Sequence, residues 1–360
     1  MGVELVTDPA EVGDAWLTRA LVDVGLAPAD ARVVDHDVVG IGAGKVGDSA
    51  RFTLRWDPPG AGPATVVGKF PAADPASRNA GVALGNYDRE VRFYRHLAPT
   101  LDVRAPACHA AELDEATGLF VLLLEDLAPA QTGDQLTGCT VAQAEAAVLE
   151  LVGLHAPRTD DPTLAEHEAW LGPRLIGGGD ELATVWAMVA PMFVERYADA
   201  VDADTVAIVE RLMGSIGRWV RHPGGPVTVT HNDYRLDNLL FGHDRDGATT
   251  VAVVDWQTVG TGPGIADVSY FIGAGLVPED RRAHESDLVA AYLDAMGAAG
   301  VELDREQARA EYRRSSLAGL VMAVFASSVV GADDRSDAMF ATMAERHAHQ
   351  ALDLDAFDLI

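Results

Sequence analysis

Polar side chains with catalytic chemistry are most concentrated in HNDYRLDN, residues 231–238. Asp233 is of the type that accepts a hydroxyl proton and orients an attacking oxygen. Asn238, and Asp255 at the end of a later apolar run, carry the hard oxygen atoms that Mg²⁺ prefers. We expect His231 to support the loop rather than to move a proton. This spacing predicts a loop that aligns a nucleophile beside a divalent cation.

Two further residues, Tyr234 and Arg235, lie inside the same loop. Both are placed where an acceptor molecule could contact them. For Arg235 the sequence leaves a second interpretation equally open, in which its guanidinium pairs with a carboxylate of the same lobe.

Lysine is scarce in this chain. Of its 27 basic residues only Lys45 and Lys69 are lysines. Lys69 ends an apolar strand, where an ammonium is costly unless an opposite charge answers it. Glu90, on a predicted helix, is the natural partner, and such a pair would aim the lysine at phosphate groups. The alternative is that Lys69 extends from a strand edge into water.

A glycine-rich stretch surrounds the other lysine. Gly42, Gly44 and Gly47 follow the G-x-G-x-x-G pattern, with Lys45 inside it. An alternating strand follows instead of a helix, which argues against a dinucleotide-binding fold. Val46 after the lysine excludes a P-loop. The remaining interpretations are a hairpin whose bare backbone covers phosphates, with Lys45 touching them or pointing into water, and a plain glycine turn.

The periodicity of apolar residues divides the chain near residue 128. Before that point it predicts helices over 8–26 and 85–97 and an antiparallel sheet with strands near 38–39, 52–56, 65–70, 112–113 and 119–124. After it, helices are predicted over 142–155, 181–197, 206–221 and much of 266–360, interrupted by short strands over 227–230, 239–241 and 250–254. The catalytic loop and Asp255 flank these short strands.

Charge and composition exclude several classes of function. The net charge is −28, which disfavours binding to nucleic acid or to anionic membrane surfaces. Two cysteines form no disulfide framework, and the N-terminal residues lack a signal-peptide pattern, so we expect a cytoplasmic protein. The uncharged run over 315–332 contains serines and glycines and is predicted to be a buried helix rather than a membrane span.

Taken in order, these motifs resemble the aminoglycoside phosphotransferase-like, or protein-kinase-like, superfamily, and most of all its branch of ecdysteroid-kinase-like and bacterial phosphotransferases. The resemblance extends over roughly residues 35–275. The resemblance rests on five segments: VVGKF, YDREVRFYRHLA, VLLLEDL, VTHNDYRLDNLLF and VAVVDWQTVGTGPGIADVSYF. The most specific parts are HNDYRLDN and VVDWQ within the last two segments.

The resemblance implies a role for each matching residue. Asp233 would be the catalytic aspartate, and Asn238 and Asp255 the magnesium ligands. Lys69 would hold the α- and β-phosphates, with Glu90 as its ion-pair partner.

Three neighbouring residues, Glu125, Asp126 and Leu127, would form the hinge whose backbone holds adenine. Asp267 would brace the catalytic loop without reacting. His155 is expected to cap or pack, and Tyr270 and Phe271 to lie in the core.

Two positions depart from the aminoglycoside-modifying members. Asn232 stands where glycine is common in them, and Asp237 where many have proline. Both departures fit the ecdysteroid-kinase-like branch, so they place aminoglycoside substrates in doubt but not phosphotransfer.

The resulting prediction is an α+β, two-lobed protein-kinase-like fold. An antiparallel-sheet lobe would span residues 1–128, and a mostly helical lobe carrying the acceptor site would span 129–360. The predicted reaction moves the γ-phosphoryl group of ATP, with Mg²⁺, to a hydroxyl of a small molecule. The alternatives are a catalytically silent nucleotide sensor and a protein Ser/Thr kinase, although no A-P-E motif follows Asp255. The acceptor, the choice between ATP and GTP, and the oligomeric state are left open.

Overall fold

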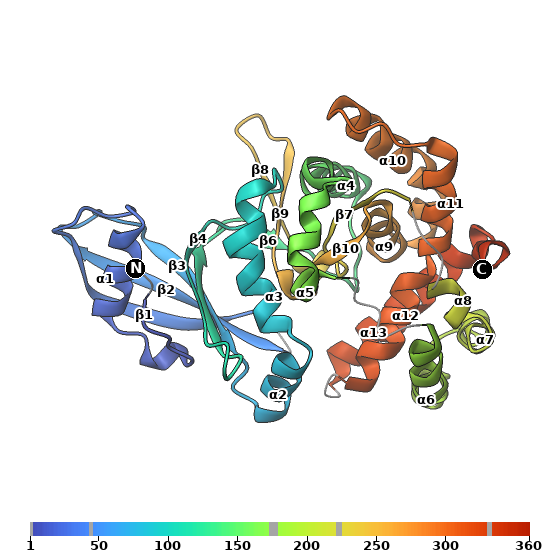
Figure 1. The fold of residues 1–360 in the computed structure, drawn as a ribbon, viewed down its shortest axis with the longest axis horizontal. Helices are drawn as coiled ribbons and strands as arrows, with labels where there is room; N and C mark the ends of the chain where they lie inside the picture. Colours follow the sequence, from blue (N-terminus) through green and yellow to red (C-terminus); the bar gives the residue numbers. More distant parts are fainter. Residues whose placement is uncertain (1–2, 43–45, 173–178, 221–224, 330–332) are drawn as a thin grey trace. The chain divides into compact units, whose positions relative to one another are not determined.

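The computed structural model of the chain describes residues 3–42, 46–172, 179–220, 225–329 and 333–360 (Figure 1). The chain folds into two compact units. The first unit contains Met1–Thr100, Ala105–Pro129 and Val254–Thr258. The second unit contains Leu101–Arg104, Ala130–Val253 and Val259–Ile360. Asp255 therefore belongs to the first unit, although most of its sequence neighbours belong to the second.

The first unit is built on an antiparallel sheet of the order β1-β2-β3-β5-β4. Its strands are β1 (Arg32–Ile41), β2 (Gly47–Asp57), β3 (Thr65–Pro71), β4 (Cys108–Leu113) and β5 (Phe120–Glu125). Helix α1 (Asp14–Asp23) packs on β1 and closes a core around Trp16, Phe52 and Trp56. This helix is shorter than predicted, because residues 9–11 form a separate 3₁₀ turn and Gly25 takes a positive φ of 78°.

Two helices of the first unit follow the sheet strand that carries Lys69. The predicted helix over 85–97 is present as α3 (Asn86–Arg92) and a π-helical turn, Phe93–Leu97. Helix α2 (Pro75–Ala83) was not predicted, since its residues form no apolar stripe; Asp74 caps it and Pro75 begins it. The ring of Phe93 stacks on Trp256 at 3.9 Å, which holds the segment Val254–Thr258 in the first unit.

Helices dominate the second unit: α4 (Val141–His155), α5 (Glu168–Leu171), α6 (Gly179–Tyr197), α7 (Ala203–Leu212), α8 (Ile216–Val220), α9 (Ile265–Gly275), α10 (Pro278–Ala298), α11 (Arg305–Ser315), α12 (Leu317–Val329) and α13 (Asp334–Asp353) (Figure 1). The single helix predicted over 206–221 is wrong: it is α7 and α8, separated near Gly214. The uncharged run contributes α12, which packs against α6 and α13. No helix among the described residues is long and apolar enough to cross a membrane.

Short strands in the second unit frame the predicted catalytic loop. Strand β7 (Val227–Thr230) pairs with β10 (Gly260–Pro263). Strands β6 (Gln131–Thr132), β8 (Leu239–His243) and β9 (Thr249–Val253) form a second sheet. The loop over 231–238 leaves β7 and enters β8, so both of its ends are fixed by strand pairing. The fold is thus α+β and two-lobed, as predicted.

Candidate active site

Lys69 contacts two carboxylates in the first unit. Its Nζ lies 2.8 Å from Oε1 and 2.7 Å from Oε2 of Glu90, and 2.9 Å from Oδ1 of Asp255. Strand β3 buries Val66 and Phe70 on one face, and its alternation places Lys69 on the other. The expected Lys69–Glu90 ion pair is therefore present, and Asp255 joins it.

The protonation of this cluster follows from burial and charge together. Burial opposes the charge of Lys69, but the carboxylates of Asp255 and Glu90 outweigh it and raise the pKa of Lys69. Burial also raises the pKa of Glu90, and the ammonium offsets part of that effect. Lys69 thus stays charged between two acidic partners.

Asp255 and Asn232 share an unusual backbone conformation. Their φ angles are +67° and +63°, in the left-handed region that non-glycine residues rarely adopt. Asn232 tolerates this region better than most residues, because its short amide side chain can bond locally. Such strained positions cluster at functional sites. Here one is a predicted metal ligand and the other adjoins Asp233.

The glycine loop is described at its two ends. Gly42 has a φ of +76°, and a Cβ on Gly47 would lie 3.1 Å from the carbonyl oxygen of Phe70. Glycine is therefore favoured at Gly42 by its backbone angle and at Gly47 by the nearby carbonyl group. Gly44 and Lys45 lie outside the described residues, so their predicted contact with phosphate stays a prediction.

The predicted hinge begins at the last residue of β5. Oε2 of Glu125 accepts a hydrogen bond from the backbone of Ala107, at 3.0 Å. The buried carboxylate of Asp126 accepts two bonds from Arg51, at 2.7 and 3.0 Å. These side chains are engaged within the unit, and the backbone N–H of Glu125 donates to the carbonyl of Ala107 at 2.8 Å. The adenine contact of residues 125–127 stays a prediction.

Asp233 in the second unit is held through both oxygens of its carboxylate. Oδ2 accepts hydrogen bonds from Asn238 Nδ2 at 2.9 Å and from Arg235 Nε at 3.2 Å. Oδ1 accepts a bond from the hydroxyl of Tyr270 at 2.8 Å. The side chain keeps 19% of its surface exposed, which leaves the carboxylate accessible to a small molecule.

The backbone of the loop is braced from α9. Both oxygens of Asp267 accept backbone N–H bonds, from His231 at 2.7 Å and from Asn232 at 2.9 Å. His155 lies 3.3 Å from the same carboxylate and 2.8 Å from the hydroxyl of Tyr292. Asp267 thus makes the contacts expected of a brace, and His155 supports it instead of only capping α4.

His231 is fully buried and turned toward its own loop. Its Nδ1 accepts the backbone N–H of Asp233 at 3.3 Å. This contact is the one a supporting residue would make.

The two open predictions on the loop are decided by neighbouring contacts. Arg235 pairs with Asp233 and, at 2.6 Å, with Asp237; burial opposes its charge, but these carboxylates raise its pKa. Tyr234 is fully buried, and its hydroxyl donates to the carbonyl of Ala147 at 2.8 Å. The expectation that Tyr234 faces an acceptor is therefore wrong, since its ring belongs to the core.

Tyr270 is the residue of this site that sequence reasoning missed. It was expected to be core, and it is buried, but its hydroxyl reaches Asp233. Its position three residues after Asp267 on one helix was a usable signal, because residues i and i+3 share a helix face.

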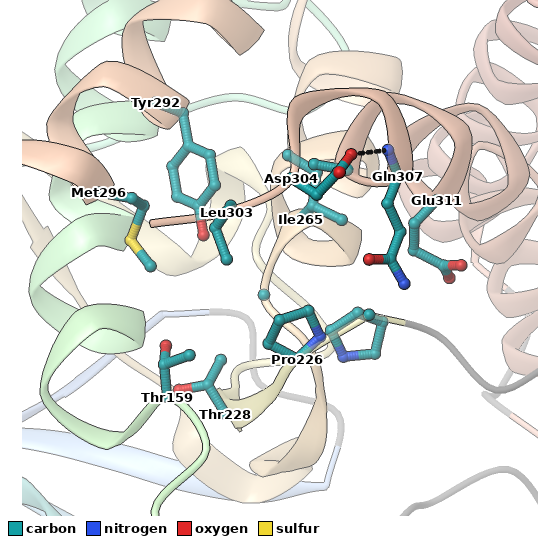
Figure 2. Close-up of a pocket in the computed structure, with 14 residues that line it drawn as sticks. Thr159, Pro226, Thr228, Ile265, Tyr292, Met296, Leu303, Asp304, Gln307 and Glu311 are labelled. Carbon is teal, nitrogen blue, oxygen red and sulfur yellow. Dashed lines mark hydrogen bonds between the residues drawn. The ribbon is translucent and has the colours of Figure 1, made fainter. Parts of the chain in front are cut away.

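A separate, small hollow lies in the second unit, and Figure 2 shows the side chains around it. Its walls come from β7, β10, α9, α10 and α11, and include Thr228, Tyr292 and Glu311. None of the predicted site residues lines it. Tyr292 connects it to the brace, because the same hydroxyl contacts His155.

With the geometry of each unit described, the chain can be compared with known proteins. The model of the phosphotransferase enzyme family matches residues 62–312. The match extends over more than half of the chain, and the chain belongs to this family.

One sequence relative and two solved structures illustrate what the chain is similar to. The chain is 32% identical over 220 residues to the N-acetylmuramate/N-acetylglucosamine kinase of Caulobacter vibrioides; the match covers 58% of this chain and 54% of that protein, so it spans about half of the relative's length. The fold is similar to that of Plasmodium vivax ethanolamine kinase, with a TM-score of 0.52, 10% identity and coverage of 90% and 83% of the two chains. It is also similar to the GDP complex of aminoglycoside 2'-phosphotransferase-IIIa, with a TM-score of 0.52, 12% identity and coverage of 93% and 97%.

Proposed function

We propose that this phosphotransferase is a small-molecule kinase, which moves the γ-phosphoryl group of a nucleoside triphosphate, ATP in the first instance, to a hydroxyl group. The observation that carries the proposal is the Asp233 carboxylate, which is held by three donors and still partly exposed. A carboxylate fixed in this way is suited to align a hydroxyl, and positioning supplies much of the catalysis in phosphoryl transfer.

Lys69 would bind the phosphates of the nucleotide. Its ammonium stays charged because Glu90 and Asp255 surround it. Two carboxylates on one ammonium also favour the approach of a further cation. Glu90 would keep Lys69 in place when phosphate oxygens compete for it.

Asn238 and Asp255 would be the magnesium ligands, since each carries an oxygen atom of the kind that Mg²⁺ prefers. The amide nitrogen of Asn238 is engaged with Asp233, which leaves its oxygen as the group's acceptor atom. Asp255 adds a carboxylate, and one or two such ligands with substrate phosphates are the usual protein contribution to Mg²⁺ sites. Magnesium, when bound, would neutralise charge on the phosphate oxygens.

The proposed step is a single displacement. The oxygen of the acceptor hydroxyl forms a bond to the γ-phosphorus, and the bond from that phosphorus to the β,γ-bridging oxygen breaks, with its electron pair leaving on the nucleoside diphosphate. The hydroxyl proton passes to Oδ1 of Asp233 and then to solvent.

A product screen tests the proposal. ADP release and the mass of the phosphorylated product would be measured with ATP or GTP, Mg²⁺ and a panel of acceptors: N-acetylmuramate, N-acetylglucosamine, ethanolamine, choline, aminoglycosides and hydroxylated hydrophobic compounds. The sugars come first, since the curated relative is named for them. We expect a product with at least one acceptor and a rate about 10³-fold lower in Asp233→Asn.

Two outcomes would overturn the proposal. Binding of ATP and Mg²⁺ without product across the panel would indicate a nucleotide sensor. Phosphorylation of serine or threonine in a protein, with no small-molecule product, would indicate a protein kinase.

A further inference from the structure

The Asp233 carboxylate has an uneven distribution of hydrogen bonds. Oδ2 accepts from both Asn238 and Arg235, whereas Oδ1 accepts from Tyr270 alone within the described part of the chain. A carboxylate oxygen has two lone pairs. Oδ2 is therefore satisfied, and Oδ1 is the oxygen with capacity for one more donor, the hydroxyl of an acceptor.

Tyr270 donates to Oδ1 and so controls the direction of the second lone pair of this oxygen. It follows Asp267 by one helical turn, so both side chains project from the same face of α9. Asp267 holds the backbone of the loop, and Tyr270 holds the carboxylate that the loop carries. One rigid helix turn thus sets both the position of the loop and the rotation of the Asp233 side chain.

The ring of Tyr270 has little freedom to move. Only 3% of the residue is exposed, and the ring lies 5.4 Å from that of His347. His347 is itself buried against Gly273 and Gly319, where an added Cβ would overlap its ring. The end of α9 is tied by Arg346, whose Nη1 donates to the carbonyl of Ala274 at 2.7 Å.

Tyr270 remains a donor under ordinary conditions. Burial and the negative charge of Asp233 raise the pKa of Tyr270 well above its usual value, so its hydroxyl keeps its proton. A neutral donor orients the carboxylate without adding a second positive charge beside that of Arg235.

We infer that Tyr270 is a positioning residue for phosphoryl transfer, which rotates the Asp233 carboxylate so that Oδ1 meets the acceptor hydroxyl. This inference rests on the proposed function. In this role Tyr270 acts through the Asp233 carboxylate, to which its hydroxyl donates a hydrogen bond. Its loss should therefore lower the rate of transfer and leave nucleotide binding unchanged.

The test is Tyr270→Phe, which removes one oxygen atom and keeps the ring. Tyr312→Phe is the matched control: Tyr312 is also buried and donates to a carboxylate, that of Glu285 at 2.8 Å, away from the loop. For each protein, kcat and the KM for ATP would be measured with the acceptor found in the screen. Rates would be expressed per ATP site titrated by calorimetry, so that a partly unfolded preparation does not imitate a slow enzyme.

We expect kcat of Tyr270→Phe to fall about 10- to 100-fold, because small misplacements of a reacting group have effects of this size. The KM for ATP should change less than about twofold, and Tyr312→Phe should keep the wild-type kcat.

An unchanged kcat in Tyr270→Phe, a loss carried by the KM for ATP, or an equal loss in Tyr312→Phe would each overturn the positioning role while leaving the proposed function intact. A wild-type protein that phosphorylates no acceptor would overturn the proposed function and this inference with it.

Discussion

The two units hold their reactive groups in different ways. In the first unit, Lys69 is fixed by opposite charge, with Glu90 and Asp255 on either side of its ammonium. In the second unit, Asp233 is fixed mainly by geometry, with the neutral donors Asn238 and Tyr270 supplementing one guanidinium. Where buried charges hold a group, changing one partner should also lower the stability of the fold, because an unpaired buried charge is costly. Where hydrogen bonds hold a partly exposed carboxylate, losing one donor should lower mainly the rate of transfer.

Among the variants that compare the two units, Lys69→Arg should have the largest effect. A planar guanidinium cannot replace a compact ammonium between two carboxylates and phosphate. The variant should remain folded, because its charge still answers Glu90, while transfer falls by about 10² to 10³-fold. Steady-state kinetics and a thermal melt would check this. The control is Arg92→Lys, which changes a partly buried arginine on α3 outside the predicted site and should stay near wild type. Wild-type turnover in Lys69→Arg would contradict the role assigned to Lys69.

Acid should affect His347, a buried basic residue of the second unit, differently from Lys69. Burial lowers the pKa of His347 to about 4, and the positive charges of Arg281 and Arg346 act in the same direction. The folded state then binds fewer protons than the unfolded state, so the stabilisation is present above pH ~6.5 and is lost as the pH falls toward 4. We expect a loss of about 3 kcal/mol in the free energy of unfolding across that window.

Urea unfolding at several pH values, compared with His347→Gln, would measure this contribution. The variant should lose the steep dependence on pH. Equal slopes in the two proteins would show that His347 is not the group responsible.

Glu90→Gln should affect both stability and rate. Lys69 keeps Asp255, so we expect a loss of about 2 kcal/mol, less than for breaking an isolated buried pair. Transfer should fall about 10-fold, since Lys69 is less well held against the phosphates. Glu115→Gln is the control: Glu115 pairs with Arg92 but is 78% exposed, so its loss should cost about 0.5 kcal/mol or less. Chemical unfolding of both variants would show whether the first unit links charge to stability.

The smallest effect is expected from Arg235→Gln. Asp233 would keep its bonds from Asn238 and Tyr270, so kcat should fall only about 3- to 10-fold. Arg335→Gln removes a more exposed arginine that also reaches Asp237, and should change kcat less than about twofold. A loss as large as that in Lys69→Arg would mean that charge, and not geometry, also governs the second unit.

Much of the fold was predictable because its signals are local. Strands β2, β3 and β5 alternate or are wholly apolar, and α4 and α6 carry clear helical periods. Helix α2 was not predictable in this way, because it lacks an apolar stripe. The break between α7 and α8 was missed because Gly214 lowers helix propensity without forbidding a helix.

Within the site, too, contacts with a local sequence signal were predicted and those that depend on distant residues were not. Lys69 and Glu90 were paired from sequence alone, since a buried ammonium needs a nearby acid. The added contact of Asp255 with Lys69 was not predicted, because nothing local brings residue 255 beside residue 69. The sequence left open whether Arg235 faces an acceptor or pairs with a carboxylate. In the structure it pairs with Asp233 and Asp237.

The family, the general order of the elements and the identity of the polar groups could be inferred from the residues alone, because side-chain chemistry and periodicity are properties of short segments. Which atoms meet depends on the folded chain. The fold places Asp255 with the first unit, buries Tyr234 in the core and brings the hydroxyl of Tyr270 to Asp233. These outcomes depend on packing between segments far apart in the chain, where distances of a few ångströms decide whether a side chain fills the core or orients a reactive group.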